Sequence, residues 1–210
     1  LAQDLLPAKK PSHVRHEEPR FKMILLGDFG VGKTTLFHRI KLGAFLEGTY
    51  PPGQHSYTCE KTLPLKLNSK NCQVQISLWD TAGEERFLSL SRSYYRDADA
   101  VLLVYSLHHL LSFDSLLHWL YLARQYCADA NLFLLGNKSD LESCVPEEKA
   151  ERFAVEHGAS GRFKVSAKTG ENVERSLQEM LERLFLRNEF QHSSLHLPLQ
   201  DASYYDKCGC

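Results

Sequence analysis

The sequence predicts an α/β fold, with a six-stranded, mostly parallel sheet, helices on both faces and one antiparallel edge strand. Short apolar runs alternate along the chain with segments of helical periodicity, as in parallel sheets. Only one pair of neighbouring runs is joined by a connection of hairpin length. The 210 residues, 43% of them hydrophobic, supply one substantial core. We expect one domain at residues 21–187, between a flexible leader at 1–20 and a flexible tail at 188–210.

The strands are predicted from apolar runs and the helices from apolar residues at helical spacing. The expected strands are at residues 21–27, 57–67, 74–80, 100–107, 131–137 and 162–167. The expected helices are at residues 33–43, 112–127, 146–158 and 172–188. The run at 57–67 contains Pro64, which cannot donate a ladder hydrogen bond. We therefore place that run at the edge of the sheet, paired antiparallel with the strand that follows it.

Charge and composition exclude several classes of function. The formal net charge is −1, from 25 basic and 26 acidic residues, so we expect no nucleic acid as a partner. The six cysteines form no CxxC pair and no zinc-binding spacing, which indicates a reducing, cytosolic compartment. No apolar run reaches the roughly 18 to 20 residues that a spanning helix needs. Membrane contact, if there is any, must therefore be peripheral or covalent.

A glycine-rich segment, GDFGVGKT at residues 27–34, follows the first expected strand and precedes the first helix. Gly27, Gly32, Lys33 and Thr34 fit the pattern G-x-x-x-x-G-K-[ST]. Glycines let backbone N–H groups surround phosphates, the helix start adds a positive dipole end, and the lysine reaches the β- and γ-phosphates. A chance glycine turn is the alternative interpretation, and the motifs further along the chain argue against it.

A magnesium ion is expected beside this loop. Asp80 ends the strand at 74–80, and open α/β sheets bind their ligands at the carboxyl ends of strands. We expect Mg²⁺ to be held by the Thr34 hydroxyl and, through water, by the Asp80 carboxylate, because oxygen atoms are the ligands that this ion prefers.

The segment GNKSD follows the strand at 131–137, and with it the chain resembles the small GTPases of the Ras superfamily, whose guanine-reading motif is N-K-x-D. The resemblance implies a P-loop small GTPase fold that binds GTP and GDP. Asp140 can accept hydrogen bonds from guanine N1–H and the exocyclic amino group, a pair of donors that adenine lacks. The resemblance also implies that residues 166–168 form the last nucleotide motif, with the Ala167 N–H meeting guanine O6, and that Phe45 packs on the base.

By this resemblance, the nucleotide contacts come from the phosphate loop, from Phe45 after the first helix, from Gly83 beside the second switch, and from the two guanine motifs. They are Asp28, Phe29, Gly30, Val31, Gly32, Lys33, Thr34, Thr35, Phe45, Gly83, Asn137, Lys138, Asp140, Ser166, Ala167 and Lys168. The expected catalytic residues are Lys33 and Glu84.

Within the superfamily the chain is most similar to the Rab GTPases of vesicle traffic, over residues 21–187. The segments WDTAGEERF and RSYYRDADAVLLVYS and the ending KCGC carry this resemblance. The ending implies geranylgeranylation of both Cys208 and Cys210, and two lipid chains suffice for stable anchoring. The resemblance implies cycling between the cytosol and the cytoplasmic face of an intracellular or plasma membrane. It also implies exchange factors, activating proteins, a prenyl-escort protein, a dissociation inhibitor and effectors as partners, and we expect a monomer.

One departure from the family concerns hydrolysis. Glu84 stands where the family has the glutamine that orients the attacking water. A carboxylate can accept a hydrogen bond from water but cannot donate one, and its charge lies near negative charge that develops on the γ-phosphate. We expect slower stimulated hydrolysis. The sign of the effect on the intrinsic rate is open, because Glu84 can also act as a base.

Phe29 is a second departure, at a phosphate-loop position that is small in most relatives. Two interpretations are open. The ring projects toward the γ-phosphate and blocks a residue that an activating protein supplies, or it folds outward over the second switch.

The first switch is the third departure. Pro52 falls where Rab proteins usually carry the threonine that contacts Mg²⁺ and the γ-phosphate. Thr49 or Thr58 are the candidate substitutes. If neither acts, the difference between the GTP and GDP states rests on Gly83 and the second switch.

Three hypotheses follow. The first is a Rab-like small GTPase that binds GTP and GDP with Mg²⁺, hydrolyses GTP and recruits effectors. The second is a membrane-anchored scaffold, either locked with GTP or insensitive to nucleotide, in which Phe29, Pro52 and Glu84 have disabled the switch between the GTP and GDP states. The third is an ATP-dependent P-loop kinase, which Asp140 argues against.

Overall fold

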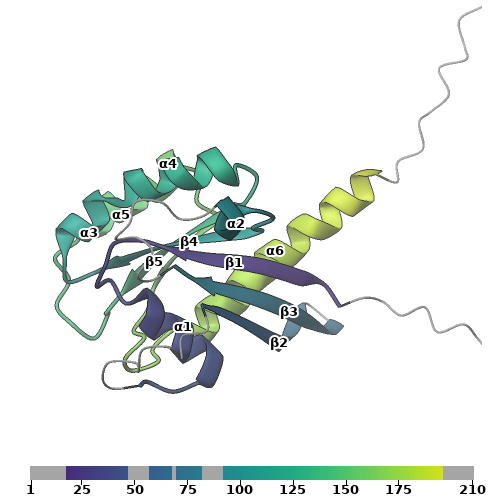
Figure 1. Ribbon diagram of the computed structural model, residues 1–210, viewed down its shortest axis with the longest axis horizontal. Helices are drawn as coiled ribbons and strands as arrows, with labels where there is room; N and C mark the ends of the chain where they lie inside the picture. Colours follow the sequence, from purple (N-terminus) through teal and green to yellow (C-terminus); the bar gives the residue numbers. More distant parts are fainter. Residues whose placement is uncertain (1–17, 47–56, 68–69, 82–91, 196–210) are drawn as a thin grey trace, which may run out of the picture.

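The computed structural model describes residues 18–46, 57–67, 70–81 and 92–195. Across these residues the chain forms one six-stranded sheet in the order β2-β3-β1-β4-β5-β6, with helices on both faces (Figure 1). The strands are β1 (Arg20–Leu26), β2 (Thr58–Leu67), β3 (Lys70–Asp80), β4 (Ala100–Ser106), β5 (Asn131–Asn137) and β6 (Gly161–Lys164). The helices are α1 (Lys33–Leu42), α2 (Arg92–Tyr95), α3 (Leu110–Asp114), α4 (Leu116–Tyr126), α5 (Glu147–Glu156) and α6 (Val173–Leu195).

The fold class predicted from the sequence is confirmed. Of the strands in the described ranges, only β2 and β3 pair antiparallel, and the other neighbouring strands are parallel. Pro64 lies in β2 at the edge of the sheet, opposite Gln73. The Gln178 amide of α6 donates to the Pro64 carbonyl at 3.0 Å, so the long last helix covers this part of the edge strand.

Two hydrophobic cores fill the spaces between the sheet and its helices. Side chains alternate along β1, because successive residues of a strand point to opposite faces. Phe21, Met23 and Leu25 belong to the core under α1 and α6. Ile24 and Leu26 belong to the core under α4 and α5. Packed side chains therefore cover both faces of the sheet.

The expected helix at residues 112–127 is wrong in one respect, because the structure divides it into α3 and α4. Ser115 lies between the two. Its hydroxyl bonds at 3.0 Å to the Leu111 carbonyl, which also accepts the Ser115 N–H. A serine that bonds back to its own helix in this way bends it.

The last helix runs to Leu195, beyond the expected end at residue 188. Residues 189–195 contain neither glycine nor proline, so nothing in this stretch stops a helix. Across the described ranges, none of the helices combines the length and apolar character needed to cross a bilayer.

The carboxyl ends of the parallel strands face one edge of the sheet, at the left of Figure 1. β1 lies in the middle of the sheet, with β3 on one side and β4 on the other. Open α/β sheets bind ligands beside such a strand, where successive connections leave in opposite directions. The described segments that carry the predicted phosphate-loop, magnesium and guanine-motif residues follow strand ends at this edge.

Candidate functional site

The loop between β1 and α1 depends on two glycines at close approaches. Gly27 has φ 153°, and a Cβ there would lie 2.1 Å from the carbonyl oxygen of Val104. Gly32 has φ 96°, and its Cβ would lie 2.4 Å from Nδ2 of Asn137. Neither position can hold a side chain without moving its neighbour, so the local sequence fixes the path of the loop against β4 and β5.

Lys33 is the first residue of α1 and is 3% exposed. Its ammonium donates to the carbonyl oxygens of Gly27 and Asp28, at 2.8 Å each. Thr34 and Thr35 follow in the first turn of α1, which contains no acidic residue to offset the positive end of the helix dipole. The amino end of α1 and the loop before it therefore form a positive cradle of the kind that binds phosphate.

Two neighbouring residues of this loop differ in their surroundings. The Asp28 carboxylate accepts a hydrogen bond of 2.8 Å from the indole N–H of Trp119 in α4. Trp119 is buried, as a packing residue would be, and it also holds the phosphate loop against α4. Phe29, by contrast, is 66% exposed, which leaves both interpretations of its ring open.

Asn137, the last residue of β5, joins the phosphate loop to the last nucleotide motif. It is 1% exposed. Its Nδ2 donates to the Val31 carbonyl at 2.9 Å, and its Oδ1 accepts the Ala167 N–H at 3.0 Å. Lys138 has φ 66° and donates from Nζ to the Gly30 carbonyl at 2.8 Å. Guanine O6 would therefore share the Ala167 N–H with Asn137.

Asp140 is oriented by the last nucleotide motif. The buried Ser166 hydroxyl donates to Asp140 Oδ1 at 2.6 Å and accepts the Thr169 N–H at 3.1 Å. The carboxylate is exposed and lies next to the segment that contains Ala167 and Lys168. A carboxylate held in this position can pair with two adjacent donors on the edge of a base.

The oxygen atoms expected to hold Mg²⁺ lie on adjacent elements. Asp80, the last residue of β3, is 3% exposed and stands opposite Leu25 in the sheet, beside the strand end that enters the phosphate loop. Thr34 is on the first turn of α1. A carboxylate and a hydroxyl match the preference of Mg²⁺ for oxygen ligands, so the donor set fits this ion.

Some predicted residues lie outside the described residues. They are Thr49, Pro52, Gly83, Glu84, Cys208 and Cys210. Thr58, the other candidate for the switch threonine, lies in β2 and pairs with Trp79. Phe45 is half-buried and lies two residues after Gly43, which ends α1 with φ 72°.

Arg39 is a residue of the site region that sequence reasoning missed. It lies in the last turn of α1, where a basic residue is ordinarily explained by the helix dipole. Its guanidinium instead contacts the carbonyl of Ala167, which is 128 positions away in the sequence. No local pattern reveals such a contact.

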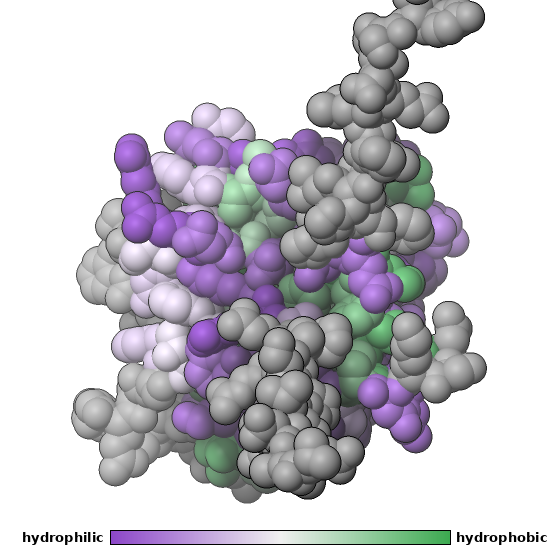
Figure 2. All heavy atoms as spheres, turned by 90° about the vertical axis from the view of Figure 1, so that its right-hand side faces the viewer, coloured by the Kyte–Doolittle hydropathy of each residue, from purple (hydrophilic) through white to green (hydrophobic). Residues whose placement is uncertain are grey.

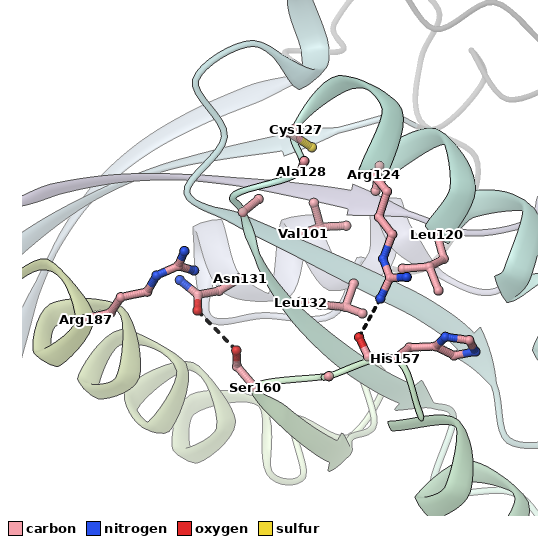
Figure 3. A pocket seen from close by; sticks show the side chains of 13 residues that line it. Val101, Leu120, Arg124, Cys127, Ala128, Asn131, Leu132, His157, Ser160 and Arg187 are labelled. Atoms are coloured by element: carbon pink, nitrogen blue, oxygen red, sulfur yellow. Dashed lines mark hydrogen bonds between the residues drawn. The ribbon is translucent and has the colours of Figure 1, made fainter. Parts of the chain in front are cut away.

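A separate cavity of about 240 Å³ lies at the opposite, amino edge of the sheet (Figure 3). Val101, Leu120 and Leu132 form its apolar floor, and the Arg124 guanidinium at its rim donates to the His157 carbonyl at 2.8 Å. None of the predicted site residues lines it. The candidate site is therefore the carboxyl edge and not this cavity.

Known proteins are similar to this chain in sequence. Residues 22–186 match the Ras family. Ras-related protein Rab-19 of Xenopus laevis is 38% identical over 175 residues, which cover 82% of this chain and 80% of that protein. Rab-26 of Bos taurus is 39% identical over 189 residues, covering 86% and 70%. Rab-37 of Mus musculus is 39% identical over 171 residues, covering 80% and 74%.

The chain therefore belongs to the Ras family of small GTPases. Within it the chain is a Rab-like small GTPase, which binds guanine nucleotides, hydrolyses GTP and acts in membrane traffic. The scaffold and kinase hypotheses are not favoured by these similarities.

Proposed function

We propose that the carboxyl edge of the sheet holds GTP and GDP, with the phosphates in the loop at residues 27–34 and the guanine at Asp140 and Ala167. The observation that carries this proposal is the position of Asn137. One buried amide bonds both to the phosphate loop and to the Ala167 N–H. The two halves of the proposed site are thereby held at a fixed separation, as a single ligand that spans them requires.

In the proposed hydrolysis, water attacks the γ-phosphate in line with the leaving GDP oxygen. Lys33 turns its ammonium from the carbonyls of Gly27 and Asp28 to the β- and γ-phosphates, and Glu84 takes the position that orients the water. Thr34 and Asp80 would hold Mg²⁺, which would supply further positive charge. Because Glu84 adds a negative charge beside the γ-phosphate, stimulated turnover is slower than with glutamine in its place.

We further propose that Cys208 and Cys210 are prenylated and that the protein cycles between the cytosol and the cytoplasmic face of a membrane. The partners would be an escort protein, a dissociation inhibitor, exchange factors, activating proteins and effectors. The ending KCGC supports the two lipid anchors. Mass spectrometry of protein isolated from cells would detect two geranylgeranyl groups, and Cys208→Ser with Cys210→Ser should leave the protein in the soluble fraction.

The hydrolytic proposal is tested by single-turnover hydrolysis of Mg²⁺-GTP on the purified full chain, with Glu84→Gln and Phe29→Ser alongside. In the presence of an activating protein we expect wild type to turn over slowly and Glu84→Gln to be faster, by about tenfold or more, as for one well-placed hydrogen bond in the transition state. The rates without that protein show whether Glu84 also acts as a base. Phe29→Ser separates the two interpretations of the ring. If the ring blocks an activating protein, the substitution increases stimulated hydrolysis and leaves the intrinsic rate unchanged.

Two outcomes would contradict the proposed roles. Wild type that turns over GTP as fast as Glu84→Gln would show that residue 84 does not limit the rate. Wild type that is inert, with both substitutions restoring turnover, would revive the scaffold hypothesis.

A further inference from the structure

Arg39 lies at the far end of the helix that begins at the phosphate loop. α1 starts at Lys33, whose ammonium is already within the phosphate loop, and ends at Leu42. Arg39 is in the last turn of this helix. A rigid helix fixes the distance between its two ends, so any loop that Arg39 holds is placed relative to the phosphates.

The Arg39 guanidinium bonds to three backbone carbonyls in two separate segments. Its Nε donates to Ala167 at 2.9 Å, one Nη donates to Lys168 at 2.5 Å, and the other Nη donates to Gly43 at 3.0 Å. It also lies against Gly170, where an added Cβ would be 3.5 Å from Nη1. The donors on all three nitrogens of the fork are thus directed at the main chain.

The two segments are those proposed to lie on either side of the guanine. Gly43 leads directly to Phe45, which is proposed to pack on the face of the base. Ala167 and Lys168 form the segment proposed to meet guanine O6. Among the described residues Arg39 bonds to backbone carbonyls, and not to the Phe45 ring or the Ala167 N–H that are proposed to contact the base.

We propose that Arg39 is a positioning residue for guanine binding, which holds the segment before Phe45 and the segment at residues 167–168 at the separation that the base requires. This inference rests on the proposed nucleotide site. Only arginine suits the position, because its planar guanidinium presents five N–H donors in fixed directions. The lysine ammonium can reach one or two of the three carbonyls but cannot bridge both segments with this geometry.

A matched control is present at the same end of α1. The Lys61 ammonium, from β2, donates to the Ile40 carbonyl at 2.7 Å. It therefore supplies the helix with a terminal cation and a carbonyl hydrogen bond, as Arg39 does, but its hydrogen bond among the described residues goes to the helix and not to the proposed guanine segments. The effect of Lys61→Ala on GDP release measures the loss of a cation from this helix end. Any larger effect of Arg39→Ala measures the positioning of the two guanine segments.

The first experiment is the dissociation rate of a fluorescent GDP analogue from the full chain, chased with excess GDP in Mg²⁺. Wild type, Arg39→Ala, Arg39→Lys and Lys61→Ala are compared, and the melting temperature of each is recorded. We expect Arg39→Ala to accelerate release by about ten- to a hundredfold, as for the loss of charge-assisted hydrogen bonds. Arg39→Lys should fall between it and wild type, and Lys61→Ala should stay within about twofold of wild type.

The second experiment asks whether the base is still recognised. Competition between GDP and 6-thioguanosine diphosphate, which keeps the N1–H and amino donors but replaces O6 with a weaker sulfur acceptor, reports the contact at Ala167. We expect Arg39→Ala to reduce the preference for GDP by about threefold or more, since O6 then meets a poorly placed N–H. A loss of general stability alone would weaken both ligands equally.

The outcomes separate this inference from the proposal on which it rests. Wild type that binds GDP, with Arg39→Ala and Lys61→Ala releasing it at equal rates or with an unchanged preference for GDP, would overturn the role of Arg39 alone. Wild type that retains no guanine nucleotide would overturn both proposals.

Discussion

The two edges of the sheet hold their polar side chains in different ways. At the carboxyl edge, Lys33, Asn137 and Ser166 are almost fully buried, and each bonds to backbone groups or to a second site residue. At the amino edge, polar side chains surround the apolar floor of a cavity at its rim (Figure 3). Figure 2, which views the amino edge, shows hydrophilic residues around smaller hydrophobic patches.

This difference indicates where substitutions should affect function. A buried polar group lowers the stability of the fold unless its hydrogen bonds are all made. A network of such groups at one edge of the sheet therefore indicates a role beyond stability. The amino edge carries no comparable network among the described residues that line its cavity. Cys127 lines that cavity, and burial raises the pKa of its thiol to about 11. The thiol is therefore protonated and uncharged at neutral pH.

The largest expected effect is at Gly32. Gly32→Ala forces a non-glycine residue into φ 96° and brings its Cβ to within 2.4 Å of Asn137 Nδ2. We expect GDP retention to fall by more than about 100-fold, because backbone strain and the displaced amide act together. Gly30→Ala is the matched control, since it has a similar φ of 79° but nothing within 4 Å of the added Cβ. Equal losses in the two variants, measured as GDP dissociation rates, would contradict the role of the close contact.

Asn137→Ala should have the next largest effect. It removes the donor to the Val31 carbonyl and the acceptor of the Ala167 N–H. Both hydrogen bonds lie in the buried part of the site. We expect the free energy of unfolding to fall by about 2–4 kcal/mol and nucleotide affinity to fall with it. Denaturant titration of the protein with and without GDP would separate the two effects. Unchanged affinity would show that the two halves of the site are held by other contacts.

A smaller effect is expected at Trp119. Trp119→Phe keeps the buried ring but removes the indole N–H that donates to Asp28. Loss of one hydrogen bond to a charged group should accelerate GDP release by about threefold to thirtyfold. Trp79→Phe is the control, because its indole donates to Ser77 Oγ at 3.0 Å, away from the loop. If the control releases GDP as quickly, the loop is not held by Asp28.

The smallest effect is expected at the amino edge. Arg124→Ala removes the exposed guanidinium that donates to the His157 carbonyl. We expect a loss of about 1 kcal/mol or less in the free energy of unfolding and no change in GDP release, because the carbonyl can bond to water instead. A clear change in GDP release would mean that the two edges are coupled, and the comparison between them would no longer hold.

The sequence predicted most of what local pattern determines. Strand ends could be located from apolar runs, so Lys33, Asp80, Asn137 and the segment at residues 166–168 were all expected at one edge, and the structure places them there. The edge position of β2 followed from Pro64, a residue that cannot sit in the middle of a sheet.

Contacts between distant segments were not predictable in the same way. Trp119 and Asp28 are 91 positions apart, and Arg39 and Ala167 are 128 apart, so no window of sequence shows either pair. Both residues also had an ordinary explanation, a buried ring in one case and a helix-end cation in the other. α3 and α4 are separate because the Ser115 hydroxyl bonds back to the Leu111 carbonyl. Helical periodicity in the sequence does not reveal such a bond.

The central claim is that the carboxyl edge recognises guanine through Asp140. Equilibrium competition of GDP, ADP and xanthosine diphosphate on wild type and Asp140→Asn tests it most directly. In xanthine an oxygen replaces the exocyclic amino group, so asparagine can accept from N1–H and donate to that oxygen. The account predicts that wild type prefers GDP to ADP by about a thousandfold or more, and that Asp140→Asn shifts the preference to xanthosine diphosphate. Similar affinities of wild type for GDP and ADP, or a variant that still prefers GDP, would contradict it.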